Sequence, residues 1–134
     1  MDRLQLQRLS ELRLRDAEVL LEGQRWDAAY YLLGYSVECA LKACVAKQFR
    51  ADDVPDRKLV NSFYTHELDK LLDIAELQMD MEREARTDSD FAINWATVKD
   101  WNETVRYDEN RTGVDAWEMY DAVKRVLQWL KTRW

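Results

Sequence analysis

The segment from Trp26 to Phe49 most constrains what this chain can fold into. It reads WDAAYYLLGYSVECALKACVAKQF, and its Ala, Leu, Val and Cys residues occur nearly all round a helical wheel. A helix that is apolar on every side is buried by other elements. We therefore expect a central helix of roughly 35 Å. Gly34 in its middle costs up to about 1 kcal/mol relative to alanine unless close packing compensates, which predicts a helix crossing there.

Apolar residues at helical spacing predict further helices on both sides of this segment. One covers residues 3–22 and ends at Gly23. Another begins with Thr65 as its N-cap and stops near Gln78. Between them, the residues 50–64 contain the sole proline and are expected to form a connection with a short helical turn near residues 58–62.

The C-terminal part carries two more helical patterns. The polar residues 80–88 are expected to connect to a helix whose apolar stripe continues toward Val105 and consists of Phe91, Trp95, Val98 and Trp101. Asp115 and Glu118 then resemble a capping box that opens the last helix. The seam of this helix alternates steps of four and three, as expected for packing nearly parallel to a neighbour, and consists of Ala116, Tyr120, Val123, Leu127, Leu130 and Trp134.

Composition agrees with this reading. With 134 residues, three Gly and one Pro, the chain has enough material for one core and little for the turns of a β protein. We therefore expect an all-α fold, a compact up-and-down bundle of four to five helices, forming a single domain over residues 1–134.

Charge and cysteine content exclude several classes of protein. The net charge of −6 argues against general duplex DNA binding, which requires basic residues that displace phosphate counterions. Cys39 and Cys44 lie on different faces of one helix, so we expect packing residues rather than a disulfide. The chain shows no secretory signal and no apolar run of the ~18–20 residues that a membrane span needs, so the expected location is cytoplasmic, without membrane contact.

A line of polar residues on the central helix is the most unusual feature. Tyr31, Tyr35, Glu38 and Lys42 recur at steps of four, three and four, so they share one face. If this face is exposed, Glu38 and Lys42 form an ordinary intrahelical pair worth a few tenths of a kcal/mol. If it is buried, the glutamate needs a partner and becomes a site candidate, and Arg106 is the partner that we predict.

His66 is the only histidine, and at a helix start it could cap, pack or face water. One histidine and two cysteines exclude a ferritin-like di-iron site and the usual zinc spacings, so no metal is expected. The sequence also lacks a Walker-type loop, a Rossmann fingerprint and a Gly-x-Ser-x-Gly elbow, so no cofactor is expected and the case for an enzyme is thin.

Three motifs together resemble the HEPN family: AAYYLLGYSVECALKA at residues 28–43, YTHELDKLL at 64–72 and WNETVRYDE at 101–109. The resemblance covers about residues 10–130. It implies a four- or five-helix bundle that commonly dimerises. Many members are encoded with a small nucleotidyltransferase as toxin and antitoxin components, and others are metal-independent ribonucleases whose signature is an Arg followed after four to six residues by a His.

Carried over to this sequence, the resemblance has one gap. Arg106 matches the arginine, but Arg111, Thr112 and Gly113 stand where the histidine belongs, and none of them is a general acid or base near neutral pH. Glu38 matches the acidic residue of the central helix.

Two further residues complete the predicted site. His66 matches the histidine of the motif at residues 64–72. The hypothesis that follows is that Glu38 orients Arg106 while Tyr107 and His66 close the same cleft. In this hypothesis the guanidinium of Arg106 binds a phosphate or a partner carboxylate through two hydrogen bonds.

The sequence therefore leaves three functions open. The first is a non-catalytic module that forms a homodimer and binds a nucleotidyltransferase-like protein, a nucleotide or RNA through a cleft with Arg106 and Glu38, with Tyr31, Tyr35 and Lys42 on the same helix face. The alternative is a ribonuclease toxin with a divergent site made by Arg106, His66 and Glu38. The third is a purely structural helical dimer with no ligand, which is favoured if the Glu38 face is solvent-exposed and the aromatic stripe fills an interface.

Overall fold

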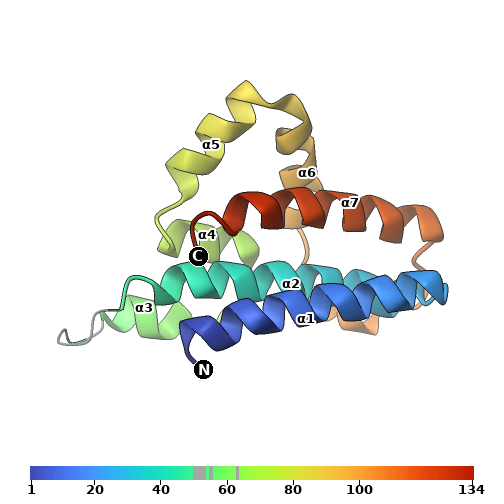
Figure 1. The fold of residues 1–134 in the computed structure, drawn as a ribbon, viewed down its shortest axis with the longest axis horizontal. Coiled ribbons are helices and arrows are strands. Elements are labelled where there is room, and N and C mark those ends of the chain that lie inside the picture. Colours follow the sequence, from blue (N-terminus) through green and yellow to red (C-terminus); the bar gives the residue numbers. More distant parts are fainter. Residues whose placement is uncertain (50–53, 55, 63) are drawn as a thin grey trace.

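The central helix of the computed structural model is α2 (Trp26–Ala46), and the structure describes residues 1–49, 54, 56–62 and 64–134. α2 packs against α1 (Arg3–Glu22), α7 (Gly113–Leu130), α4 (Leu68–Ile74) and the 3-10 helix η1 (Glu103–Tyr107). Figure 1 shows α1, α2 and α7 lying side by side along the long axis of the molecule. The prediction of a central, mostly buried helix is confirmed.

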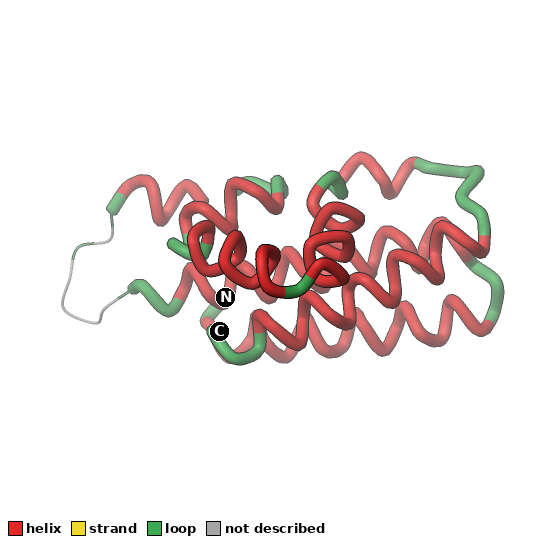
Figure 2. Tube along the Cα trace, turned by 90° about the horizontal axis from the view of Figure 1, so that it is seen from above, coloured by secondary structure: helices red, strands yellow, loops and turns green. Residues whose placement is uncertain are grey.

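The remaining helices cover one end and one side of this layer. α3 (Arg57–Ser62) lies near the C-terminal end of α2, and α6 (Ser89–Lys99) packs on α7. α5 (Gln78–Thr87) contacts α6 and rises away from the α1–α2–α7 layer (Figure 1). Seen from above, the described part of the chain consists of helices and loops (Figure 2). The described residues contain seven α-helices and no strand, so the all-α bundle is confirmed with more helices than the four to five predicted.

The α1–α2 hairpin is closed by a short turn and by buried hydroxyls. α1 has the predicted bounds and ends at Gly23, and Gln24 then adopts a left-handed φ of 59° that reverses the chain. Ser10 Oγ donates to the carbonyl of Ser36 at 2.8 Å, and Ser36 Oγ donates to the carbonyl of Ser10 at 2.7 Å. Both serines are fully buried, so this reciprocal pair satisfies their hydroxyls and fixes the register of the two helices.

Several predicted boundaries need correction. α2 ends at Ala46 rather than Phe49, and α4 begins at Leu68 rather than after Thr65. Thr65 Oγ1 accepts from the backbone N–H of Glu67 at 3.2 Å, so it stabilises the turn before the helix and does not cap it. The short helical turn expected near residues 58–62 is confirmed as α3, whereas Pro55 lies outside the described residues.

The polar residues 80–88 form most of a helix, not a connection. α5 reads QMDMEREART, which is rich in good helix formers, with Asp80 in its first turn and Arg86 in its last, as the helix dipole favours. Its one buried residue is Met81. The hydrophobic pattern therefore did not predict this helix, because Met81 is the one residue that α5 buries.

Gly34 contacts an indole rather than a crossing helix. Trp101 lies between α6 and η1 and is 2% exposed, and a Cβ at Gly34 would stand 2.2 Å from its Cδ1. Close packing at Gly34 is thus confirmed, but the predicted helix crossing is wrong. The stripe ending at Trp101 is buried as expected, although α6 already ends at Lys99.

The last helix begins with a capping box three residues earlier than predicted. Thr112 Oγ1 accepts from the N–H of Asp115 at 3.1 Å, and Asp115 Oδ2 accepts from the N–H of Thr112 at 3.2 Å. Along α7 the predicted seam is buried or partly buried throughout. Among the described residues, no helix combines the length and apolar character that a membrane crossing requires.

Candidate functional site

The polar line of α2 is buried. Glu38 is 2% exposed and Lys42 is 8% exposed, while Tyr31 and Tyr35 are half-buried. The reading of an exposed intrahelical pair is therefore wrong. The condition for a purely structural helical dimer, an exposed Glu38 face, is not met either.

Glu38 is paired on both carboxylate oxygens. Lys42 Nζ lies 3.3 Å from Oε2, and His66 Nδ1 lies 2.8 Å from Oε1. An ionised carboxylate only accepts hydrogen bonds, so the His66 proton must sit on Nδ1, which leaves the lone pair of the neutral imidazole on Nε2. Among the described residues Arg106 makes no bond to Glu38, so the predicted Glu38–Arg106 pair is replaced by Glu38–His66.

Arg106 points to aromatic neighbours instead. Its Nη2 donates to the Tyr107 hydroxyl at 3.0 Å, and its Cζ lies 4.9 Å from the centroid of the Tyr107 ring. Its interactions with the Tyr107 hydroxyl, followed by those with Tyr31, hold the pKa of Arg106 above its already high ordinary value. Arg106 is exposed, so it presents a permanent positive charge to solvent.

Arg106 lines a cleft of about 710 Å³ between the start of α2 and residues 106–111, which we call the arginine cleft. Its walls consist of Gln24, Arg25, Trp26, Asp27, Ala28, Tyr31, Leu32, Arg106, Glu109 and Arg111. Three guanidinium groups and two aromatic side chains thus share one cleft with two carboxylates.

Arg111 is held firmly at the edge of this cleft. Its Nε and Nη2 both lie 2.9 Å from Asp108 Oδ2, and its Cζ lies 3.8 Å over the Tyr30 ring. The Arg111 backbone N–H donates to Asp27 Oδ1 at 2.8 Å, which ties the loop before α7 to the first turn of α2. Burial, opposed in part by Arg111, raises the pKa of Tyr30. The loop therefore carries a fixed arginine where the catalytic signature has a histidine.

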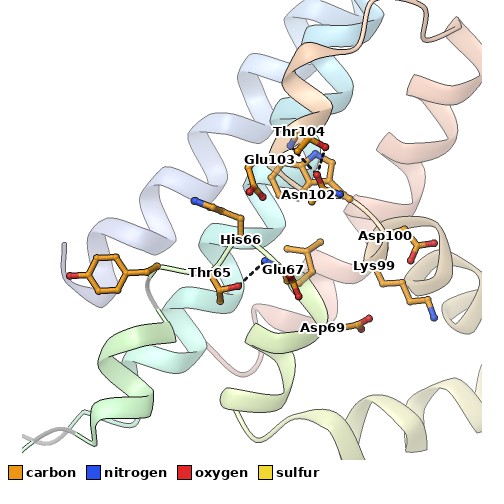
Figure 3. A pocket seen from close by; sticks show the side chains of 12 residues that line it. Thr65, His66, Glu67, Asp69, Lys99, Asp100, Asn102, Glu103 and Thr104 are labelled. Carbon is orange, nitrogen blue, oxygen red and sulfur yellow. Dashed lines mark hydrogen bonds between the residues drawn. The ribbon is translucent and has the colours of Figure 1, made fainter.

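His66 lines a different cleft, of about 560 Å³, which we call the histidine cleft (Figure 3). It lies between the segment before α4 and the segment that joins α6 to η1, and it includes Trp101. Figure 3 shows His66 beside Glu103, with Lys99 and Asp100 at the other rim. The single cleft predicted for Arg106 and His66 is therefore wrong.

The other predicted site residues are divided as well. Tyr31 lines the arginine cleft, whereas Tyr35, Glu38 and Lys42 line a third cavity of about 360 Å³ beneath the start of α1. Tyr107 lines neither the arginine nor the histidine cleft and is 70% exposed. Six of the seven predicted residues thus line three different cavities, and Tyr107 lines none of the three.

Sequence reasoning missed most of the arginine cleft. Arg25 immediately precedes α2 and Trp26 is the first residue of this helix, and no sequence motif marks either of them. Arg111 was noted only as the place of a missing histidine. Its five-residue spacing from Arg106 was a usable signal, because the signature places two side chains at this spacing in one site.

Neither cysteine is a surface thiol. Cys39 and Cys44 are buried and unbridged, and burial raises the pKa of Cys39 to about 12 and that of Cys44 to about 11. They are packing residues, as predicted. Within the part of the chain that the structure describes, no three His, Cys, Asp or Glu side chains gather in a way that could hold a metal ion.

These features define an all-α bundle domain with a buried carboxylate–imidazole pair on its central helix and an arginine on the short helix before the last one. The sequence model of the HEPN domain matches residues 5–133, nearly the whole chain, and the chain therefore belongs to the HEPN family. No curated protein and no solved structure matches the chain with significance.

Proposed function

We propose that this HEPN domain is a non-catalytic binding module that holds the phosphate of a nucleotide or of RNA in the arginine cleft. One observation carries the proposal. Arg106 and Arg111, which occupy the two positions of the ribonuclease signature, line one cleft and are both permanently charged. This pair can bind an anion but has no group to move a proton.

The rest of the arginine cleft supports a nucleotide ligand. Arg25 and Arg106 form no ion pair with a described residue, so their charges remain available to phosphate oxygens. Trp26 and Tyr31 supply aromatic faces on which a base can stack. The N-terminus of α2, with no side-chain cap, adds free backbone N–H groups.

The histidine cleft argues against the ribonuclease alternative. It contains the carboxylates of Glu67, Asp69, Asp100 and Glu103 against one lysine, Lys99. A phosphodiester is repelled by such walls, and His66 can act on RNA only within direct or one-water reach of the scissile phosphate. Because Arg106 lines another cleft, a site uniting the two residues is not supported.

The proposal extends to a biological setting. HEPN domains commonly dimerise. We extend this to a homodimer that works with a nucleotidyltransferase-like partner protein in a toxin–antitoxin or other nucleotide-related system. A cytoplasmic location is part of the same proposal.

Isothermal titration of the full chain with ATP and with a short adenosine RNA tests the proposed ligand. We expect Arg106→Gln to weaken binding by roughly tenfold or more, as for loss of a charge-assisted hydrogen bond. Arg8→Gln, at an exposed position of α1, removes the same charge elsewhere and should leave the Kd within about twofold.

Three results would contradict the proposal. If neither ATP nor the RNA binds, or if wild type and Arg106→Gln bind equally well, the proposed phosphate site is refuted. Cleavage of the RNA by the wild type in the presence of chelator, lost in both Arg106→Ala and His66→Ala, would instead establish the ribonuclease.

A further inference from the structure

The loop between η1 and α7 is fastened to the start of α2. The backbone N–H of Arg111 donates to Asp27 Oδ1 at 2.8 Å, and the Arg111 guanidinium lies over the Tyr30 ring, with its Cζ 3.8 Å from the centroid. Gly113, the first residue of α7, packs against Trp26, because a Cβ at Gly113 would stand 3.1 Å from Cζ2 of the indole. The loop and the helix that follows it are therefore held on the N-terminal part of α2.

An ion pair also closes the loop on itself. Nε and Nη2 of Arg111 both lie 2.9 Å from Asp108 Oδ2. Asp108 is the C-cap of η1, and Arg111 directly precedes Thr112, the N-cap of α7. The pair thus joins the end of one helix to the start of the next. We call the contacts of Arg111 with Asp108, Asp27 and Tyr30 the loop clamp.

The guanidinium of Arg111 is engaged before a ligand enters the arginine cleft. Its Nε–Nη2 edge can bind a phosphate through two parallel hydrogen bonds, and Asp108 already occupies this edge. Asp108 does not itself line the cleft. Arg106 and Arg25, by contrast, line the cleft and form no ion pair with a residue that the structure describes. The three arginines of the cleft are therefore not equivalent.

The position of the loop sets the width of the arginine cleft. The cleft lies between the start of α2 and residues 106–111, so the distance between its walls depends on how the loop sits on α2. Trp26 and Asp27 line the cleft and are contacted directly by Gly113 and by the loop. A cleft whose walls are fixed in advance loses less conformational freedom when it binds a ligand. The loop clamp therefore favours binding without touching the ligand.

On the basis of the proposed function, we infer that Arg111 is a positioning residue and that Arg106 and Arg25 make the contacts to phosphate. Arg111 acts through its side chain, which Asp108 holds, and through its backbone N–H, which Asp27 accepts. The two positions of the ribonuclease signature thus have different tasks in this chain.

Isothermal titration of the full chain with ATP separates the two roles through the sign of one effect. Asp108→Ala should weaken ATP binding roughly three- to tenfold, because the loop loses the anchor of its guanidinium. If Arg111 instead bound phosphate directly, the same change would tighten binding, since it frees the guanidinium and removes a negative charge. Glu109→Ala is the matched control. It removes a carboxylate of the same loop that forms no ion pair with a described residue, and it should tighten ATP binding by up to about threefold.

Arg111→Lys separates charge from geometry. Lysine keeps the positive charge, but it has neither the paired donors that meet Asp108 nor the flat group that stacks on Tyr30. A positioning role predicts that Arg111→Lys weakens ATP binding as much as Arg111→Gln does, roughly three- to tenfold. A direct contact predicts that lysine, which also binds phosphate, retains most of the affinity that glutamine loses.

Amide exchange tests the loop clamp without a ligand. In NMR spectra of the full chain, the backbone N–H of Arg111 should exchange roughly tenfold faster or more in Asp108→Ala, because a loosened loop then makes its bond to Asp27. The backbone N–H of Ala40, a buried residue of α2, should exchange as in the wild type, which shows that the fold is intact.

The overturning results differ from those for the phosphate site. The inference fails if Asp108→Ala binds ATP as tightly as the wild type or more tightly, or if Glu109→Ala weakens binding equally. It also fails if Arg111→Lys retains the affinity that Arg111→Gln loses, or if exchange of the Arg111 N–H is unchanged in Asp108→Ala. Absence of ATP binding by the wild type refutes the proposed function, and amide exchange then still decides whether the loop clamp exists.

Discussion

Replacing Gly34 with alanine would place a methyl group against the indole of Trp101. The added Cβ would stand 2.2 Å from Cδ1, 2.2 Å from Nε1 and 2.3 Å from Cδ2, whereas ordinary contacts begin at 3.4 Å. The ring or the helix must therefore move by more than 1 Å. Because Trp101 is 2% exposed and stacks on Tyr31 at 5.8 Å, the ring has no free direction in which to move.

The expected loss of stability lies between two cases, an overpacked core and a Trp101 side chain that is no longer buried. Overpacking of a core costs about 1–3 kcal/mol. Complete loss of the burial of a tryptophan costs about 3–5 kcal/mol. Alanine returns up to about 1 kcal/mol through its better helix propensity. We therefore expect Gly34→Ala to lower the free energy of unfolding by about 2 kcal/mol, with about 4 kcal/mol as the ceiling.

Thermal and urea unfolding followed by circular dichroism measure this change. At roughly 3–5 °C per kcal/mol for a domain of this length, the Tm should fall by roughly 6–10 °C. Gly23→Ala is the matched control, because its Cβ would meet the nearest atom at 3.6 Å, an ordinary contact. This control should change the Tm little.

A double-mutant cycle gives the result that would refute the reasoning. In a Trp101→Ala background the obstruction is gone, so Gly34→Ala should become neutral or stabilising. Equal destabilisation by Gly34→Ala with and without Trp101 would show that the indole is not the cause.

Three other predictions concern the core and one helix cap. Ser36→Ala should cost about 1–2 kcal/mol in urea unfolding, because it removes the buried hydroxyl that donates to the carbonyl of Ser10 on α1, and an unchanged midpoint would contradict this. Cys39 should react slowly with a disulfide reagent at pH 8 and rapidly in urea, since burial raises its pKa to about 12; fast reaction of the native chain would contradict its buried position. The backbone N–H of Phe91, followed by Arg125, lowers the pKa of Asp88 from 3.8, so its stabilisation is complete above that pH and is lost as the pH falls below it. Asp88→Asn keeps the cap without this titration, so thermal unfolding between pH 3 and 6 should show a shallower acid loss, and identical slopes would refute the assignment.

The sequence predicted the helices that bury a regular face. α1 and α7 were placed to within a few residues because their apolar residues repeat at helical spacing over many turns. α5 was missed because only Met81 of its residues is buried, so it has no apolar stripe to detect. Its helix-forming composition was the signal that remained, and the polarity of the segment obscured it.

The sequence predicted several residues of the site but not which of them lie together in the folded chain. The spacing on α2 correctly placed Glu38 and Lys42 on one face, because helical periodicity determines which side chains share a face. Which side chain from elsewhere meets Glu38 depends on the path of the chain through residues 64–67 and 100–107, and no local pattern specifies that path. His66 binds Glu38, whereas Arg106, on η1, lines the arginine cleft instead.

The helix α5 buries little apolar surface and is attached to the C-terminal part of the chain partly through charge. Met81 and the partly buried Ala85 pack on the core, and two ion pairs tie α5 to the C-terminal part of the chain: Glu84 with Arg125 of α7 at 2.9 Å and Asp80 with Arg133, beyond α7, at 3.9 Å. Such solvent-accessible, partly buried pairs weaken as salt screens them, so α5 should exchange its amide protons sooner than α2 does. Its loss or lengthening would leave the α1–α2–α7 layer intact. This projecting helix is therefore the part of the chain that can change in evolution, or accept an inserted reporter sequence, at the smallest cost to the two clefts.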